Sequence, residues 1–128
     1  MNLLLDTCTF LWYITRSPGL PERVRAAIAD RENAVHLSSV SVFEIASKQA
    51  AGRLVLPSLA DPFIPDIRTQ LEILSLPFSE AAALQVARLP KIHKDPFDRM
   101  LIGQAIAEGM ILVTPDPHIH RYPIRWTW

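Results

Sequence analysis

The sequence predicts an α/β fold in which helices cover a mainly parallel sheet. Short apolar runs of strand length alternate along the chain with segments whose apolar residues recur at helical spacing. One run, Met110 to Val113, is apolar without interruption, as expected for a parallel strand covered on both faces. Several of the 11 prolines fall where one predicted element ends and the next begins. This alternation is typical of a sandwich built around a parallel sheet.

The length and composition predict one domain that spans residues 1–128. About half of the residues, 49%, are hydrophobic, which is enough for one real core. The 13 basic and 13 acidic residues balance, so the net charge gives no indication of a polyanionic partner such as a nucleic acid. A single cysteine, Cys8, excludes an internal disulfide framework and fits a reducing compartment. No apolar run approaches the ~20 residues of a membrane span, and the first residues do not form a signal peptide. We therefore expect a cytoplasmic protein with no membrane partner.

The first half of the chain predicts two strands, each followed by a helix, with a further helix between them. The first strand is Asn2 to Leu5, and Thr7 is the predicted cap of the helix after it. Pro21 opens a second helix, which leads to a strand at Ala34 to Leu37. The serines that follow this strand can cap another helix, which we expect to end near Gly52.

The second half begins with the least regular stretch of the sequence and ends with the clearest helix. Arg53 to Pro65 is predicted to be a loop, followed by a short helix near Asp66. The remaining predicted elements are a strand at Glu72 to Leu76, a helix at Ser79 to Arg88, a helix from Asp95-Pro96 to Gly109, a strand at Met110 to Val113 and an edge strand around Ile124 to Trp126. Asp95 before Pro96 is a strong helix start, and Gly109 supplies a left-handed stop.

Four acids occupy equivalent places in this pattern. Asp6 and Asp116 follow the first and fourth strands, while Glu44 and Asp98 lie near the beginnings of two helices. In open parallel sheets, binding sites lie beyond the carboxyl ends of the strands, at the point where the strand order reverses. If the first and fourth strands are neighbours there, these four carboxylates face one crevice.

Local roles compete with a shared site for three of the four acids. Ser41-x-x-Glu44 matches a capping box, and Asp95-x-x-Asp98 matches its acidic variant. Asp116, between two prolines, also suits a plain turn. Asp6 is harder to explain locally, because it directly follows three leucines, where an unpaired carboxylate is costly to bury.

Four converging carboxylates without a basic partner indicate a hard divalent cation. Mg²⁺ or Mn²⁺ suits a set of oxygen ligands, whereas zinc favours histidine or cysteine. We interpret the sequence His118-x-His120 as part of a polar loop and Cys8 as a small core residue.

Four blocks of sequence resemble the PIN-domain ribonucleases, and more narrowly the VapC-type toxins of toxin–antitoxin pairs. They are Leu-Leu-Leu-Asp-Thr-Cys at 3–8, Ser-Val-Phe-Glu-Ile-Ala at 41–46, His-Lys-Asp-Pro-Phe-Asp-Arg at 93–99 and Leu-Val-Thr-Pro-Asp at 112–116. The resemblance implies a three-layer α/β/α sandwich that carries a Mg²⁺- or Mn²⁺-dependent endoribonuclease site. It maps the catalytic and metal-ligating cluster onto Asp6, Glu44, Asp98 and Asp116.

The resemblance also implies supporting residues and partners. Asp95 is expected to cap a helix or support the ligands, and Thr114 to orient Asp116 or a water. Family members form homodimers and are inhibited by a cognate antitoxin, so a VapB-like antitoxin is the implied partner. The cations expected to guide the RNA backbone are Lys48, Arg53, Lys94 and Arg99. Cys8 and Pro115 are visible departures from many relatives, although neither removes an acid.

The expected reaction is hydrolysis of an RNA phosphodiester by a water that one or two metal ions activate. Asp6 and Asp98 are the expected direct ligands. Two alternatives remain open at the level of sequence. One is a PIN-like module that has lost catalysis and serves as a binding or scaffold protein. The other is a DNA nuclease of the same fold.

Overall fold

A computed structural model describes all 128 residues and contains one five-stranded sheet with the order β3-β2-β1-β4-β5. The strands are β1 (Asn2–Leu5), β2 (Ala34–Ser38), β3 (Leu74–Leu76), β4 (Ile111–Val113) and β5 (Trp126–Thr127). Every neighbouring pair is parallel. From the central β1, the chain adds β2 and β3 on one side of the sheet and then β4 and β5 on the other. The strand order therefore reverses between β1 and β4. This confirms the predicted α/β class and the predicted neighbours.

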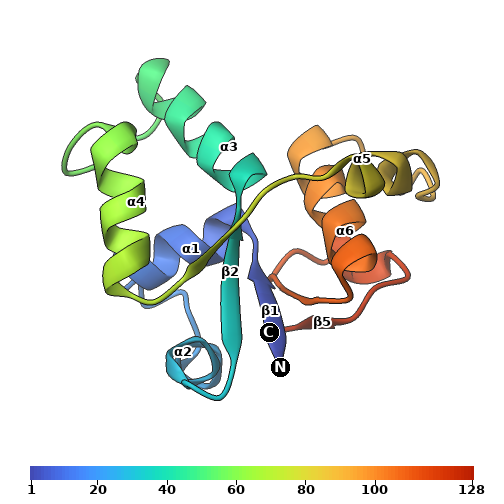
Figure 1. Cartoon of the computed structure of the whole chain (residues 1–128), viewed down its shortest axis with the longest axis horizontal. Helices are drawn as coiled ribbons and strands as arrows, with labels where there is room; N and C mark the ends of the chain where they lie inside the picture. Colours follow the sequence, from blue (N-terminus) through green and yellow to red (C-terminus); the bar gives the residue numbers. More distant parts are fainter.

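Helices form a layer on each side of the sheet (Figure 1). The helices are α1 (Thr7–Ile14), α2 (Glu22–Ala29), α3 (Ser39–Ala50), α4 (Ala60–Gln70), α5 (Glu80–Ala87) and α6 (Pro96–Glu108), and a short 3₁₀ helix, η1, spans Ile119–Arg121. In Figure 1, α1 to α4 lie on one side of the strands, and α5 and α6 lie on the other. The result is the predicted three-layer α/β/α sandwich.

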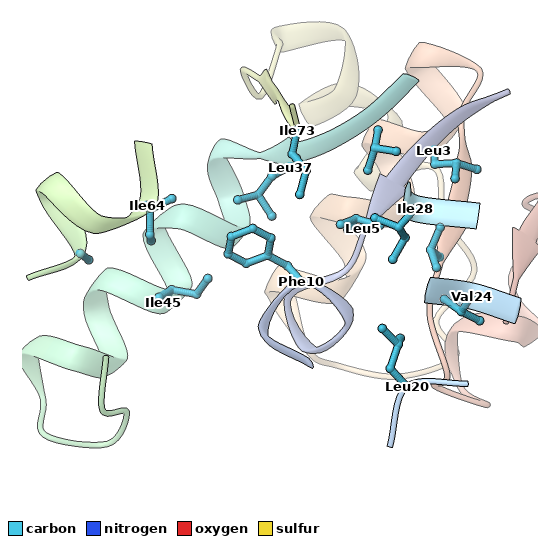
Figure 2. Close-up of a cluster of buried hydrophobic side chains, with 13 residues drawn as sticks. Leu3, Leu5, Phe10, Leu20, Val24, Ile28, Leu37, Ile45, Ile64 and Ile73 are labelled. Carbon is cyan, nitrogen blue, oxygen red and sulfur yellow. The ribbon is translucent and has the colours of Figure 1, made fainter. Parts of the chain in front are cut away.

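The leucines of β1 show why both faces of the sheet are covered. Leu3 and Leu5 point into one core, together with Phe10 of α1 and Ile45 of α3 (Figure 2). Leu4 points the opposite way, into a second core that includes residues of α6. Successive side chains of a strand face opposite sides, and all three leucines are fully buried, so both faces of β1 are covered. The continuous apolar run is therefore the mark of a central strand.

The predicted Thr7 cap and the Ser41 capping box are both wrong, whereas a serine that follows β2 caps α3 as predicted. Thr7 is the first residue of α1, and the residue that caps this helix is Asp6, whose carboxylate accepts from the backbone N–H of Thr9 at 2.7 Å. Ser38 caps α3, so Ser41 lies inside that helix and is buried. The capping-box explanation of Glu44 is therefore wrong, because Glu44 lies in the second turn of α3.

Two predicted elements have different lengths. The helix expected near Asp66 is the 11-residue α4, which contains Pro65 in its interior. Proline normally disfavours an interior helical position because it lacks a backbone N–H, which explains why the sequence pattern underestimates this helix. The third strand begins at Leu74 rather than at Glu72. Glu72, two residues after the end of α4, has a left-handed backbone (φ 57°), and this conformation is incompatible with a strand at that residue.

The register of the central strands places two of the four acids beside each other. Leu5 of β1 pairs with Val113 of β4, and the Asp6 N–H donates to the Val113 carbonyl at 3.2 Å. Asp6 and Thr114, the residues that directly follow these two strands, are therefore neighbours, and Asp116 lies two residues after Thr114. No helix of the protein has the length and apolar character that crossing a bilayer requires.

Candidate active site

A cavity of about 350 Å³ lies at the carboxyl ends of β1 and β4, and all four predicted acids line it. Each acid comes from a different part of the chain: Asp6 follows β1, Glu44 lies on α3, Asp98 opens α6 and Asp116 follows β4. The other lining residues are Thr7, Cys8, Leu11, Trp12, Lys48 and Pro115. Four carboxylates thus share one cavity with a single basic side chain, that of Lys48.

Asp6 is the most deeply buried of the acids, with 5% of the residue exposed. Burial raises the pKa of its carboxyl, and the nearby Asp116 charge adds to the rise. Hydrogen bonds from Thr114 and Thr9 oppose the rise by favouring the charged form. No salt bridge compensates Asp6. Its carboxylate therefore combines two roles, since it caps α1 and also presents a buried charge to the cavity.

Asp98 lies in the first turn of α6, and its carboxylate contacts a histidine side chain. Asp95 caps the helix by accepting from the Asp98 N–H at 3.1 Å, as predicted. The Asp98 carboxylate does not complete a capping box but lies 3.2 Å from Nε2 of His93, measured from its Oδ2 atom. Burial raises the pKa of Asp98 to about 6, with the Asp95 and Asp116 charges adding to the rise and His93 opposing it.

Glu44 is partnered on both of its oxygens. Thr7 Oγ1 donates to Glu44 Oε1 at 2.7 Å, and Lys48 Nζ lies 2.6 Å from Oε2. Thr7 Oγ1 also lies 2.9 Å from the hydroxyl of Ser41, which explains why a serine is buried in α3. The Glu44–Lys48 pair connects successive turns of one helix, and Glu44 is the less exposed partner, with 12% of its side chain accessible against 40% for Lys48.

Asp116 forms a turn and faces the site at the same time. Its Oδ1 accepts from the backbone N–H of His118 at 2.8 Å, as the turn interpretation predicts. Its own N–H donates to Oγ1 of the fully buried Thr114 at 3.1 Å. The Thr114 side chain also lowers the pKa of the Asp6 carboxyl, so one residue acts on both of the acids that follow neighbouring strands. Pro115 lines the cavity and does not turn Asp116 away from it.

The sequence reasoning missed His93. Single atoms of His93, Asp98 and Asp116 lie within 4.8 Å of one another. His93 also stacks on His118, with ring centroids 5.8 Å apart, and meets the edge of the Tyr122 ring. The only signal in the sequence was its presence at the start of the 93–99 block. That block did not reveal its partner Tyr122, which is 29 residues away.

Cys8 lies in a different place from the one expected, whereas His118 lies in an exposed turn, as predicted. Cys8 is not a core residue, because it is half-buried in the cavity wall. Burial raises the pKa of its thiol to about 11, with the charges of Asp6 and Asp116 adding to the rise. His120 lies outside the cavity, where its Nε2 is 2.7 Å from the Thr114 carbonyl and its ring stacks on Trp126.

The four predicted RNA-guiding cations separate into three groups. Lys48 lines the cavity and pairs with Glu44. Arg53 and Lys94 are exposed and lie outside the cavity lining. Arg99 is half-buried, and its Nη1 donates to the Pro90 carbonyl at 2.8 Å and to the Tyr122 hydroxyl at 3.0 Å.

The donor set of the cavity fits a hard divalent cation. Its four carboxylates supply oxygen ligands only. Burial and the neighbouring carboxylate charges raise the pKa of Asp6 and of Asp98, which shows that the site concentrates negative charge. The one ammonium in the wall engages Glu44 and leaves the other three acids without a cation. A cation of the Mg²⁺ or Mn²⁺ type would offset this concentration of negative charge.

A protein-family model described as "PIN domain" matches residues 3–124 of the chain. No curated protein sequence matches at a significant level. The family match covers all four blocks singled out in the sequence and every element of the sheet except its last strand.

Solved structures share the whole fold at low sequence identity. VapBC2 from Rickettsia felis, bound to a DNA fragment from its promoter, matches with a TM-score of 0.75 and 17% identity over 99% of this chain and 98% of that chain. DNA-bound VapBC from Salmonella typhimurium matches with a TM-score of 0.69 and 21% identity over 99% and 97%. FitAcB from Neisseria gonorrhoeae matches with a TM-score of 0.67 and 22% identity over 98% and 96%. At these identities the likeness establishes the fold.

Proposed function

The chain belongs to the PIN domain family, and from this premise we propose that it is a Mg²⁺- or Mn²⁺-dependent endoribonuclease that acts as the toxin of a toxin–antitoxin pair. The observation that carries the proposal is the convergence of Asp6, Glu44, Asp98 and Asp116 on one cavity. These acids come from four separate parts of the chain, and capping or turn formation at each one does not require them to meet. A shared cation gives a common reason for all four positions.

The residues have distinct tasks in this proposal. Asp6 and Asp98 are the direct metal ligands, while Glu44 and Asp116 complete the set directly or through water. Thr114 orients Asp116 by accepting from its backbone N–H, and Asp95 holds the start of α6. When bound, the cation supplies the charge that activates a water and stabilises the developing negative charge on the phosphate. Lys48 at the cavity wall is placed to meet an RNA phosphate.

Exposed aromatic residues beside the site support a protein partner. Phe43 of α3 is 63% exposed, and its ring lies 6.0 Å from that of Phe97 on α6. Both belong to an apolar hollow of about 250 Å³, which Phe78 and Met100 also line. Exposed apolar patches of this kind mark interaction sites. We propose a VapB-like antitoxin as the partner, a homodimer as the assembly and residues 1–128 as one PIN domain.

The test is cleavage of structured RNA and of DNA by the purified protein, with Mg²⁺, with Mn²⁺ and with EDTA. We expect RNA to be cut only when one of the divalent ions is present. Asp98→Asn should reduce the rate at least a hundredfold, because it removes a charged ligand. The matched control is Glu108→Gln, which removes an exposed acid at the opposite end of the same helix and should retain the wild-type rate.

Each other outcome contradicts a defined part of the proposal. Cleavage of DNA but not RNA would identify a DNA nuclease. Cation binding without cleavage of either polymer would indicate a binding or scaffold module. Cleavage that survives EDTA or Asp98→Asn would remove the metal assignment.

A further inference from the structure

The candidate site contains a hydrogen-bond chain that leads away from the cavity, from Asp98 through His93 to Tyr122 and Arg99. His93 Nε2 lies 3.2 Å from Asp98 Oδ2, and His93 Nδ1 lies 2.7 Å from the Tyr122 hydroxyl. The distances alone do not say which ring nitrogen carries the proton. The neighbours of the Tyr122 hydroxyl answer that question.

The Tyr122 hydroxyl oxygen already accepts two hydrogen bonds from groups that can only donate. Arg99 Nη1 donates to it at 3.0 Å, and the backbone N–H of His93 donates at 3.2 Å. Guanidinium and amide N–H groups have no acceptor, and a hydroxyl offers two lone pairs and one proton. Tyr122 is buried, with 3% exposed, so its proton needs a partner inside the protein. His93 Nδ1 is the remaining neighbour, and it must accept.

We propose that Tyr122 and Arg99 hold His93 in the tautomer protonated on Nε2, which makes His93 a positioning residue that donates to Asp98 rather than a metal ligand. With Nδ1 occupied as an acceptor, the one ring proton of neutral His93 lies on Nε2 and points at Asp98 Oδ2. This bond fixes the rotation of the carboxylate and leaves Oδ1 for the cation. Partners that orient a ligand in this way are typical of metal sites.

The arrangement also assigns a role to Arg99 that differs from RNA binding. The two N–H groups of its Nη1 are directed to the Pro90 carbonyl and to Tyr122. The Pro90 contact joins the loop before α6 to the helix itself. Arg99 therefore supports the Asp98 side chain through two intermediates. This inference rests on the proposed function only in naming Asp98 as a ligand of the cation.

The tautomer can be read directly in the metal-free protein. Long-range ¹H–¹⁵N correlation spectra of the histidine side chains distinguish a protonated from an unprotonated ring nitrogen, and the spectrum of His93→Gln identifies the His93 signals. We expect Nε2 protonated and Nδ1 unprotonated in the wild type, and a change in the Nδ1 chemical shift in Tyr122→Phe, which removes the donor to Nδ1 while Nε2 still faces Asp98. A wild-type Nδ1–H tautomer, or an Nδ1 shift unchanged in Tyr122→Phe, would overturn the proposal.

Substitutions at His93 distinguish a positioning residue from a ligand. The amide nitrogen of glutamine can occupy the place of Nε2 and donate to Asp98, whereas that of asparagine reaches only the place of Nδ1. We expect His93→Asn and His93→Leu to weaken Mn²⁺ binding at least tenfold and His93→Gln to restore it to within about threefold of wild type. Equal losses for all three folded variants would mean that the ring itself coordinates the ion.

The two experiments keep the inference separate from the proposed function. If the wild-type protein binds no Mn²⁺ and cuts no RNA, the proposed function fails. The spectra of the metal-free protein still decide whether Tyr122 sets the tautomer of His93. Thermal unfolding of each variant in EDTA identifies any that fail to fold, and Tyr122→Phe serves as the second variant if the His93 series is unstable.

Discussion

The carboxylate of Asp6 accepts a hydrogen bond from the backbone N–H of Thr9 at 2.7 Å while only 5% of the residue is exposed. One side chain thus closes the first turn of α1 and brings a buried negative charge to the cavity. The cap stabilises the fold, whereas the charge opposes it, because burial raises the pKa of this carboxyl. These two effects can be separated by mutation.

Asp6→Asn should abolish cation binding without destabilising the metal-free protein. Asparagine caps helices as well as aspartate does, and it removes the buried charge next to Asp116. Thermal unfolding in EDTA should give a melting temperature equal to or above that of the wild type, and Mn²⁺ titration should show no binding. Asp6→Ala is the control, since it also loses the cap and should cost about 1 kcal/mol. Wild-type Mn²⁺ affinity in Asp6→Asn would contradict the site.

The metal-free protein should lose stability as the pH rises from about 4 to 6 because of Asp98. Its pKa is raised from 3.8 to about 6 in the folded state, chiefly by burial. Across this window the folded state therefore holds a proton that the unfolded state has released, and the free energy of unfolding falls with rising pH. Urea unfolding in EDTA at several pH values measures the slope.

The matched comparison is between Asp98→Asn and Glu108→Gln. Asp98→Asn removes one titrating group and should reduce the slope in this window, to which the raised pKa of Asp6 also contributes. Glu108→Gln, at the exposed end of the same helix, should leave it unchanged. A saturating concentration of Mn²⁺ should reverse the trend, because the ion binds the deprotonated carboxylates. Equal slopes in the wild type and in Asp98→Asn would show that Asp98 does not carry the effect.

Lys48→Gln should strengthen cation binding. The Lys48 ammonium lies 2.6 Å from Glu44 Oε2, so it competes with a metal ion for that carboxylate. Its removal should raise Mn²⁺ affinity about fivefold, which corresponds to the ~1 kcal/mol of a partly exposed ion pair. Isothermal titration calorimetry measures the change. The control is Arg88→Gln, which removes an exposed positive charge outside the cavity and should leave Mn²⁺ affinity unchanged. Weaker Mn²⁺ binding by Lys48→Gln would contradict the idea that Lys48 competes with the ion for Glu44.

Cys8 should report the electrostatics of the cavity. Burial raises the pKa of its thiol to about 11, and Asp6 and Asp116 add to the rise. Alkylation by iodoacetamide at pH 8 should therefore be about tenfold to a hundredfold slower in the folded protein than in urea, because the thiolate is the reactive form. Asp6→Asn should increase the folded rate, although burial remains the larger cause. A folded rate equal to that in urea would contradict the buried, acidic setting.

The sequence was sufficient for the elements whose signals are local. Asp95-Pro96 and Gly109 mark the two ends of α6, and three consecutive leucines mark a central strand. It was also sufficient for the convergence of Asp6 and Asp116, because residues that follow neighbouring parallel strands lie at the same edge of the sheet. These features depend on short segments and on one rule of topology.

Contacts between distant segments were beyond the sequence. Thr7 and Glu44 are 37 residues apart, and His93 and Tyr122 are 29 apart, so no local spacing connects them. α4 was underestimated because Pro65 normally interrupts a helix. The site was therefore predictable as a set of acids, whereas the side chains that hold them in place required the folded chain.

Helix α6, whose first turn carries Asp98, packs closely against α5 at Gly103. Gly103 of α6 is buried, and a Cβ added there would lie 2.7 Å from Val86 Cγ2 and 3.0 Å from the Ala82 carbonyl of α5. Gly103→Ala should therefore push the two helices apart and cost about 1–3 kcal/mol, measured by urea unfolding. The exposed Ala107→Ser on the same helix should change the stability by less than about 0.5 kcal/mol.

A double variant determines whether this contact is the cause. Val86→Ala removes the nearest atom, so Gly103→Ala combined with Val86→Ala should be less destabilising than the sum of the two single changes, with a coupling of about 0.5–3 kcal/mol. The Ala82 carbonyl cannot be removed in this way, so the rescue should be incomplete. Because α6 begins at the helix turn that carries Asp98, Gly103→Ala should also weaken Mn²⁺ binding in the fraction that remains folded. Strict additivity of the two changes would show that the α5–α6 contact does not limit the helix position.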